Sequence, residues 1–159
     1  VSEMNECKII MYHYVRPIKN SKYPNIRGLE LDGFQRQIEF FGKNFHFINI
    51  EELLDSVYSN KTIPKNSMLL TFDDGFKDHF SYVFPILKKL NIQGCFFPVA
   101  KPIEKNLVLD VHKIHFILAN TSEQNLVKEI FQSIRENKNK FSLKNPEDYF
   151  KELGIPSRF

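Results

Sequence analysis

The sequence has no tryptophan, two cysteines and six glycines among its 159 residues. Cys7 and Cys95 lie far apart and form no CxxC pair, which excludes a disulfide-rich scaffold and a zinc knuckle. No apolar run approaches the ~18 residues that a membrane span needs. The first residues have neither the basic start nor the apolar stretch of a signal peptide, so we expect a cytoplasmic protein.

The sequence also lacks an excess of either positive or negative charge. The 22 Lys and Arg residues nearly balance the 19 Asp and Glu residues, and the surplus of +3 is spread along the chain. The sequence therefore gives no reason to expect nucleic acid as a partner. Apolar residues make up 42% of the chain and aromatic residues 14%, which is enough for one packed domain and excludes disorder.

Short apolar segments rich in β-forming residues recur through the first hundred positions. They predict strands at residues 8–15, 45–50, 67–72 and 94–99. Segments with helical periodicity separate them. Regular alternation of strand and helix is typical of an α/β fold with a parallel sheet or barrel.

Capping residues mark where these helices begin. Asp32 is the expected N-cap of the first helix, and Asn49 with Glu52 has the pattern of a capping box ahead of the second. A third helix is expected at about residues 80–90, with Pro85 at a kink or a late start.

The alternation stops after residue 105. Residues 109–119, 122–137 and 146–153 all have helical patterns, and no convincing strand follows Val99. We therefore expect residues 8–105 to be the N-terminal part of an α/β domain and residues 106–159 to be a helical insertion or extension of it. A four-stranded α/β unit with a helical tail is unusual, so we also expect the chain to be part of a longer protein.

The segment Leu69–Gly75 has the strongest chemical signal. It reads as an apolar strand that runs directly into Asp73, Asp74 and Gly75. Two neighbouring carboxylates serve one site only where a strand ends and the backbone turns, which a glycine allows. Such a pair ionises readily beside a cation, and carboxylate oxygens suit divalent metals. The alternative is an ordinary strand-to-loop turn.

His13 follows the first predicted strand in the same way. Because the carboxyl ends of parallel strands meet at one edge of a sheet, His13 is expected close to Asp73 and Asp74, within about 10 Å, close enough to line one pocket. The alternative is a histidine with a purely structural hydrogen bond. The neighbouring Tyr12 and Tyr14 offer either a surface for stacking sugars or ordinary core packing.

The sequence resembles a known family at these residues. The matching segments, in the same order and spacing across residues 8–100, are Met11–Val15, Thr71–Phe76, Phe84–Lys89 and Cys95–Phe97. They look like a polysaccharide deacetylase of carbohydrate esterase family 4. The resemblance implies an irregular (β/α) barrel, here incomplete, and a metal-dependent hydrolase that removes acetyl groups from N-acetylated sugars of an oligo- or polysaccharide.

The resemblance also implies roles for individual residues. Asp73 would be the catalytic general base, Asp74 a ligand of a divalent metal such as Zn²⁺, and His13 a catalytic residue that lines the site. The family's two histidine ligands belong to a later motif that is absent here, so the remaining ligands are expected beyond residue 159. The chain by itself is accordingly expected to be inactive.

A pair of histidines, His112 and His115, departs from the family's spacing. A metal site there is geometrically possible, because positions three apart share a helix face. We prefer the alternative, in which Val111, Ile114 and Leu118 form the buried stripe and the histidines flank it. Two rival functions stay open: a carbohydrate-binding or assembly module without turnover on the same fold, and another metal hydrolase that shares only the Asp-Asp-Gly junction.

Overall fold

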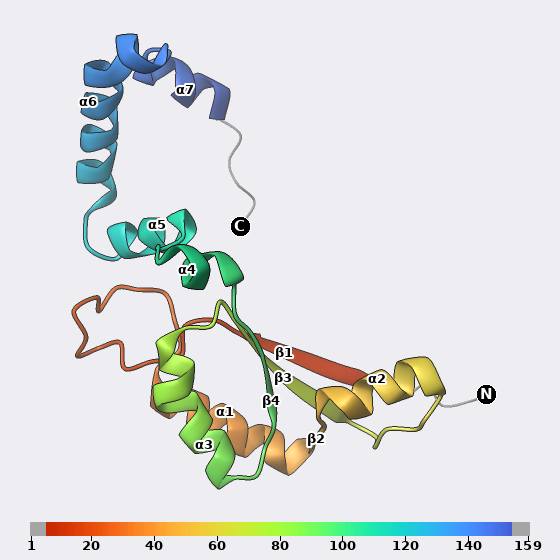
Figure 1. The fold of residues 1–159 in the computed structure, drawn as a ribbon. Coiled ribbons are helices and arrows are strands. Elements are labelled where there is room, and N and C mark those ends of the chain that lie inside the picture. Colours follow the sequence, from red (N-terminus) through yellow and green to blue (C-terminus); the bar gives the residue numbers. More distant parts are fainter. Residues whose placement is uncertain (1–5, 154–159) are drawn as a thin grey trace.

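Strand β3 (Ser67–Asp73) is the centre of a parallel sheet (Figure 1). β1 (Cys7–Tyr12) pairs with β3 along one side, whereas β2 (His46–Phe47) and β4 (Gly94–Phe97) share the other side, beside its start and its end respectively. The structure is a computed structural model and describes residues 6–153. All three pairings are parallel, which confirms the predicted α/β architecture. The described strands form an open sheet, so closure into a barrel stays a prediction.

Helices connect the strands, and four further helices follow the last described strand. In chain order they are α1 (Leu31–Asn44), α2 (Ile50–Ser59), the π-helix η1 (His79–Val83), α3 (Phe84–Lys89), α4 (Ala100–Lys105), α5 (Asp110–Leu118), α6 (Glu123–Phe141) and α7 (Pro146–Leu153). Figure 1 shows α6 running away from the sheet, with α7 at its far end. Among these described helices, none is long and apolar enough to cross a bilayer.

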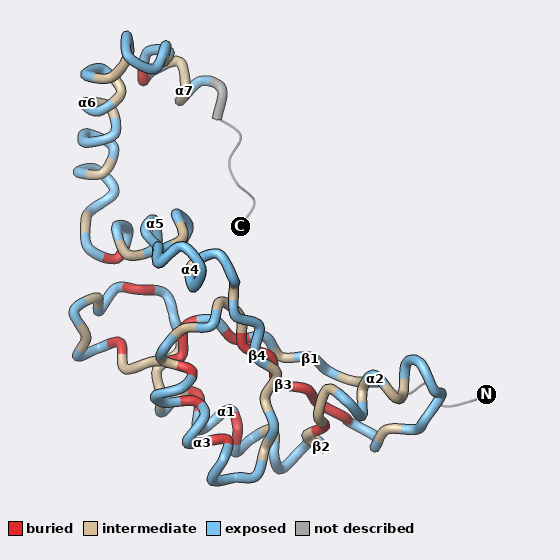
Figure 2. The backbone as a smooth tube through the Cα atoms, viewed as in Figure 1, coloured by how far each residue is buried: buried red, intermediate tan, exposed pale blue. Residues whose placement is uncertain are grey.

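The main core lies on the face of the sheet that α1 and α3 cover. The rings of Tyr12 and Phe72 stack with centroids 5.2 Å apart, and Phe34 of α1 meets Tyr12 edge-on at the same distance. The buried members of this cluster are Tyr12, Val15, Phe34, Ile38, Met68, Leu70, Phe72, Val83 and Leu87. In Figure 2 most buried segments lie in the sheet, in the helices beside it and in the loop after β1, whereas α6 has none. This packing fixes the ends of β1 and β3 side by side.

The helix starts agree with the sequence in two places and differ in one. The capping box is confirmed, since the Asn49 side chain accepts from the Glu52 N–H at 2.7 Å and the Glu52 side chain accepts from the Asn49 N–H at 2.8 Å. Pro85 lies in the first turn of α3, directly after η1, which confirms the late start. The expected N-cap at Asp32 is wrong, because the N-cap is Glu30, two residues earlier, and α1 begins at Leu31.

Glu30 makes tertiary bonds that the local sequence does not reveal. Its carboxylate accepts hydrogen bonds from the backbone N–H groups of Ile18 and Lys19, at 3.1 and 2.6 Å. These bonds attach the start of α1 to the long loop that follows β1. A loop contact therefore determines where α1 begins, in place of the local cap that Asp32 would provide.

The burial of Phe72 in the core leads to a prediction about the free energy of unfolding. Phe72 is fully buried, so Phe72→Ala should lower the free energy of unfolding by about 3–5 kcal/mol. The matched control is Phe80→Ala, because Phe80 is 75% exposed and its truncation should change stability by no more than about 0.5 kcal/mol. Chemical denaturation of both variants is the measurement. Equal losses would contradict the assignment of the core to this face of the sheet.

Candidate active site

The register between β1 and β3 brings His13 and Asp73 together. Tyr12 pairs with Phe72, so the next residue of each strand lies at the same carboxyl edge of the sheet. His13 Nε2 is 3.9 Å from Asp73 Oδ2, which confirms the expected closeness of these two residues. This separation is too long for a hydrogen bond and short enough for an ion pair when His13 is protonated. Both side chains are partly exposed, at 45% and 30%, and are accessible to a substrate.

The backbone turns sharply directly after Asp73. Asp74 and Gly75 have φ values of +72° and +63°, in the left-handed region that aspartate tolerates and glycine adopts freely. A Cβ on Gly75 would lie 2.7 Å from Cβ of Pro98, just beyond β4, so the turn also needs the space that glycine leaves. The turn separates the directions of two consecutive carboxylates.

Asp74 faces α5 and makes its contact with His112. Its Oδ2 is 3.2 Å from His112 Nε2, and the His112 side chain is only 9% exposed. The preferred sequence interpretation of α5 is therefore wrong. The three residues expected to be buried, Val111, Ile114 and Leu118, are about half exposed. His112 is buried instead.

The buried face of α5 follows from what the helix docks against. Phe116 and Ala119 pack into a second apolar cluster, which also includes Tyr14, Ile18 and Ile26 from the loop after β1. The rings of Tyr14 and Tyr23 lie edge-on to Phe116, with centroids 6.1 and 4.7 Å apart. Helix α5 therefore turns Phe116 and the imidazole of His112 inward, with Ala119 just beyond its end, and leaves its larger aliphatic side chains outside.

Tyr14 connects β1 with α5. Its ring stacks on Phe76 with centroids 4.4 Å apart, and its hydroxyl lies 3.3 Å from Nδ1 of His115. Burial, reinforced by the negative charge of Asp74, raises the pKa of Tyr14 and keeps the phenol neutral. Tyr12 is buried as well, and its hydroxyl donates to Gln37. Both tyrosines are packing residues, so the structure does not support the sugar-stacking alternative.

Two contacts near the edge were missed by sequence reasoning. The buried His79 of η1 donates from Nε2 to the backbone carbonyl of His13 at 2.6 Å, and its Nδ1 has no hydrogen-bond partner among the described residues. Arg16 Nη1 is 3.5 Å from Asp78 Oδ2, in an ion pair that joins the loop after β1 to the start of η1. The signal in the sequence that could have indicated these contacts is the position of Asp78 and His79, three and four residues after Gly75.

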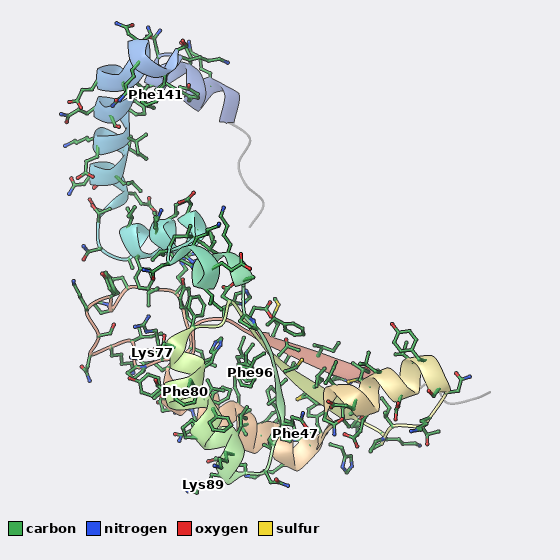
Figure 3. All side chains as sticks on the ribbon, viewed as in Figure 1. Phe47, Lys77, Phe80, Lys89, Phe96 and Phe141 are labelled. Carbon is green, nitrogen blue, oxygen red and sulfur yellow. The ribbon has the colours of Figure 1, made fainter. Side chains whose placement is uncertain are left out.

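A cleft of about 570 Å³ lies away from this edge. It opens between α2, α3 and β4, and Figure 3 shows two of its lining residues, Phe47 on β2 and Phe96 on β4. Neither His13 nor the two motif aspartates line it. The titratable groups therefore mark the candidate site better than the shape of the surface does.

The donors at the edge fit a borderline divalent metal. The carboxylate oxygens of Asp73 and Asp74 and the imidazoles of His13 and His112 are the ligand types that Zn²⁺ accepts. Within residues 6–153, no group of three or more His, Cys, Asp or Glu side chains is placed to hold one ion. The described residues thus bring suitable ligand types to one edge, with Asp74 beside His112, but do not by themselves assemble a three-ligand site.

Comparison with known proteins identifies the family. A sequence model of the polysaccharide deacetylases matches residues 60–141, just over half of the chain. The chain belongs to the polysaccharide deacetylase family. The match includes the Asp73–Gly75 turn and extends through α5 to the end of α6. No curated protein sequence matches the chain.

Solved structures of deacetylases have a similar fold. A de-N-acetylase from Aggregatibacter actinomycetemcomitans is 21% identical with a TM-score of 0.56, and 65% of this chain aligns with 42% of that protein. IcaB from Ammonifex degensii is 27% identical with a TM-score of 0.53, over 63% of this chain and 41% of its own. The Streptococcus pyogenes deacetylase PplD, solved with acetate, is 20% identical with a TM-score of 0.54, over 87% of this chain and 70% of its own. The chain thus spans less than half the length of the first two.

The backbone turn at Gly75 leads to a second prediction about stability. Gly75→Ala should lower the free energy of unfolding by about 2 kcal/mol or more, because a positive φ and a clash with Pro98 both oppose the new methyl group. Gly42→Ala is the control. Gly42 lies in α1, where a Cβ would make only an ordinary contact, and alanine should stabilise the helix by about 0.5–1 kcal/mol. Thermal denaturation compares the two, and an unchanged Gly75→Ala variant would contradict the geometry of the turn.

Proposed function

We propose that this chain forms part of the active site of a metal-dependent carbohydrate deacetylase that hydrolyses N-acetyl groups of an oligo- or polysaccharide. One observation carries the proposal. In a member of the polysaccharide deacetylase family, His13 and the motif carboxylates lie at the carboxyl ends of two adjacent parallel strands. One of the similar structures is named a de-N-acetylase, which supports hydrolysis of an amide rather than an ester.

Asp73 is proposed as the general base. Its carboxylate would take a proton from the water that attacks the acetamide carbonyl carbon. The carbon–nitrogen bond then breaks as the leaving nitrogen takes up a proton, which releases acetate and the sugar amine. The partial exposure of Asp73 supports this role, because a base must reach both water and substrate. His13 is proposed as the second catalytic residue, facing Asp73 and contacting the substrate.

Asp74 is proposed as a ligand of a divalent metal, with Zn²⁺ as the expected ion. Such an ion, when bound, supplies Lewis acidity that polarises the acetamide carbonyl and lowers the pKa of water toward ~7. The turn supports separate roles for the two aspartates, because Asp73 lies beside His13 whereas the carboxylate of Asp74 contacts His112 on α5.

Residues 8–105 and 106–159 are proposed to belong to one domain, with the second segment as a helical insertion or extension. The family match supports a single unit, since it crosses residue 105 without interruption. The contact between Asp74 and His112 supports it too, because it joins the two segments across 38 positions of the sequence.

The third prediction separates the two carboxylates in the full-length protein. Asp73→Asn should retain metal while kcat falls roughly 10²–10⁴-fold, the effect of a lost general base. Asp74→Asn should lose metal, and with it activity. Asp110→Asn serves as a control, because Asp110 is exposed on α5 and pairs only with Lys113 among the described contacts. Elemental analysis gives the metal content, and turnover of an N-acetylated chito-oligosaccharide gives the activity.

Other outcomes would overturn parts of the proposal. Equal metal loss in Asp73→Asn and Asp74→Asn would make both aspartates ligands and leave the base elsewhere. A wild-type protein that holds metal and binds N-acetylated sugars without turnover would favour the carbohydrate-binding module. Because residues that act as a unit are non-additive, the difference in metal content between the variants matters more than the size of either loss.

A further inference from the structure

We propose that His112 of α5 is a positioning residue for Asp74. Its Nε2–H donates a hydrogen bond to Asp74 Oδ2 and holds the carboxylate in one orientation, so that the other oxygen remains available at the edge of the sheet. This inference rests on the proposed role of Asp74 as a metal ligand. It assigns a function at the site to α5, a helix that lies after the motif segments at residues 8–100.

The direction of the hydrogen bond follows from the chemistry of the two groups. An ionised carboxylate can only accept, so the imidazole must donate across the 3.2 Å between Nε2 and Oδ2. The two side chains are 9% and 24% exposed, which removes most competing water from the contact. Hydrogen bonds to a charged partner in such surroundings are stronger than those between neutral groups.

Packing on two sides fixes the ring of His112. Phe76, which follows the turn after Asp74, lies against it with centroids 4.9 Å apart, and Tyr14 approaches it edge-on at 6.3 Å. Phe116 of α5 and Ala119, the residue directly after α5, anchor the helix in the second apolar cluster. The imidazole is therefore held by the same elements that form the edge, and its orientation does not depend on Asp74 alone.

Asp74 needs such a partner because of its place in the chain. It follows the end of β3 at a left-handed backbone position, outside the ladder of the sheet. Ligand carboxylates in metal sites are commonly hydrogen-bonded by a second residue, and losing that residue typically lowers metal affinity 10–100-fold. His112 is the side chain that the structure places at this position.

Zinc affinity of the full-length protein tests the inference, with Zn²⁺ alone as the probe in competition with a chromophoric chelator. His112→Ala should weaken binding by about 10–100-fold. His112→Gln should recover affinity to within about threefold of wild type, because the Gln amide donates a hydrogen bond but is a poor zinc ligand. His115→Ala is the matched control. It lies on the same helix, contacts the Tyr14 hydroxyl, and should leave zinc affinity unchanged.

Three results would overturn the inference. Wild-type affinity in His112→Ala would reduce the residue to packing. Equal weakening in His112→Ala and His112→Gln would exclude the donor role and make the imidazole itself a ligand. Equal weakening in His112→Ala and His115→Ala would attribute the effect to loss of α5. Thermal denaturation of each variant, run alongside, identifies any that fail to fold.

A second measurement keeps this inference separate from the proposed function. Long-range ¹H–¹⁵N correlation in the metal-free protein reports which nitrogen of His112 carries the proton. We expect the Nε2–H form, with ring nitrogen shifts that move in Asp74→Asn and do not move in Asp110→Asn. An Nδ1–H ring would overturn the inference. A wild-type protein that binds no zinc but retains the Nε2–H form and its response to Asp74→Asn would instead contradict the proposed metal role of Asp74.

Discussion

The parallel pairing of β1 with β3, in which Tyr12 lies opposite Phe72, is the interaction on which the candidate site depends. A slip of one residue would turn every side chain of β1 to the other face of the sheet and remove His13 from Asp73. The stacked rings of Tyr12 and Phe72, with Phe34 against Tyr12, oppose such a slip because it would expose an aromatic core residue. The apolar core thereby sets the position of the polar edge.

The turn at the end of β3 then divides the two motif carboxylates between two surroundings. Asp73 continues the strand and faces His13 in a partly open position, whereas Asp74 turns toward the nearly buried imidazole of His112. Gly75 permits this arrangement through its positive φ and its close approach to Pro98. A single change of backbone direction thus gives two neighbouring aspartates different surroundings.

Local patterns predicted much of this arrangement. The strands, the capping box at Asn49 and the closeness of His13 to Asp73 all depend on periodicity or on parallel topology, which the sequence expresses directly. The N-cap at Asp32 and the buried stripe of α5 were wrong because tertiary contacts decided them. Helix α5 has apolar residues around most of its circumference, so only its docking on Tyr14 and Phe76 determines that His112 faces inward.

Asp74, rather than Asp73, is the proposed metal ligand at the edge shared by β1 and β3. Anomalous diffraction from crystals of the full-length protein grown with Zn²⁺ tests it most directly. We predict an anomalous peak about 2.0–2.2 Å from a carboxylate oxygen of Asp74, with the Asp73 carboxylate outside coordination distance. A peak bound by Asp73 and His13, or one away from this edge altogether, would contradict the account.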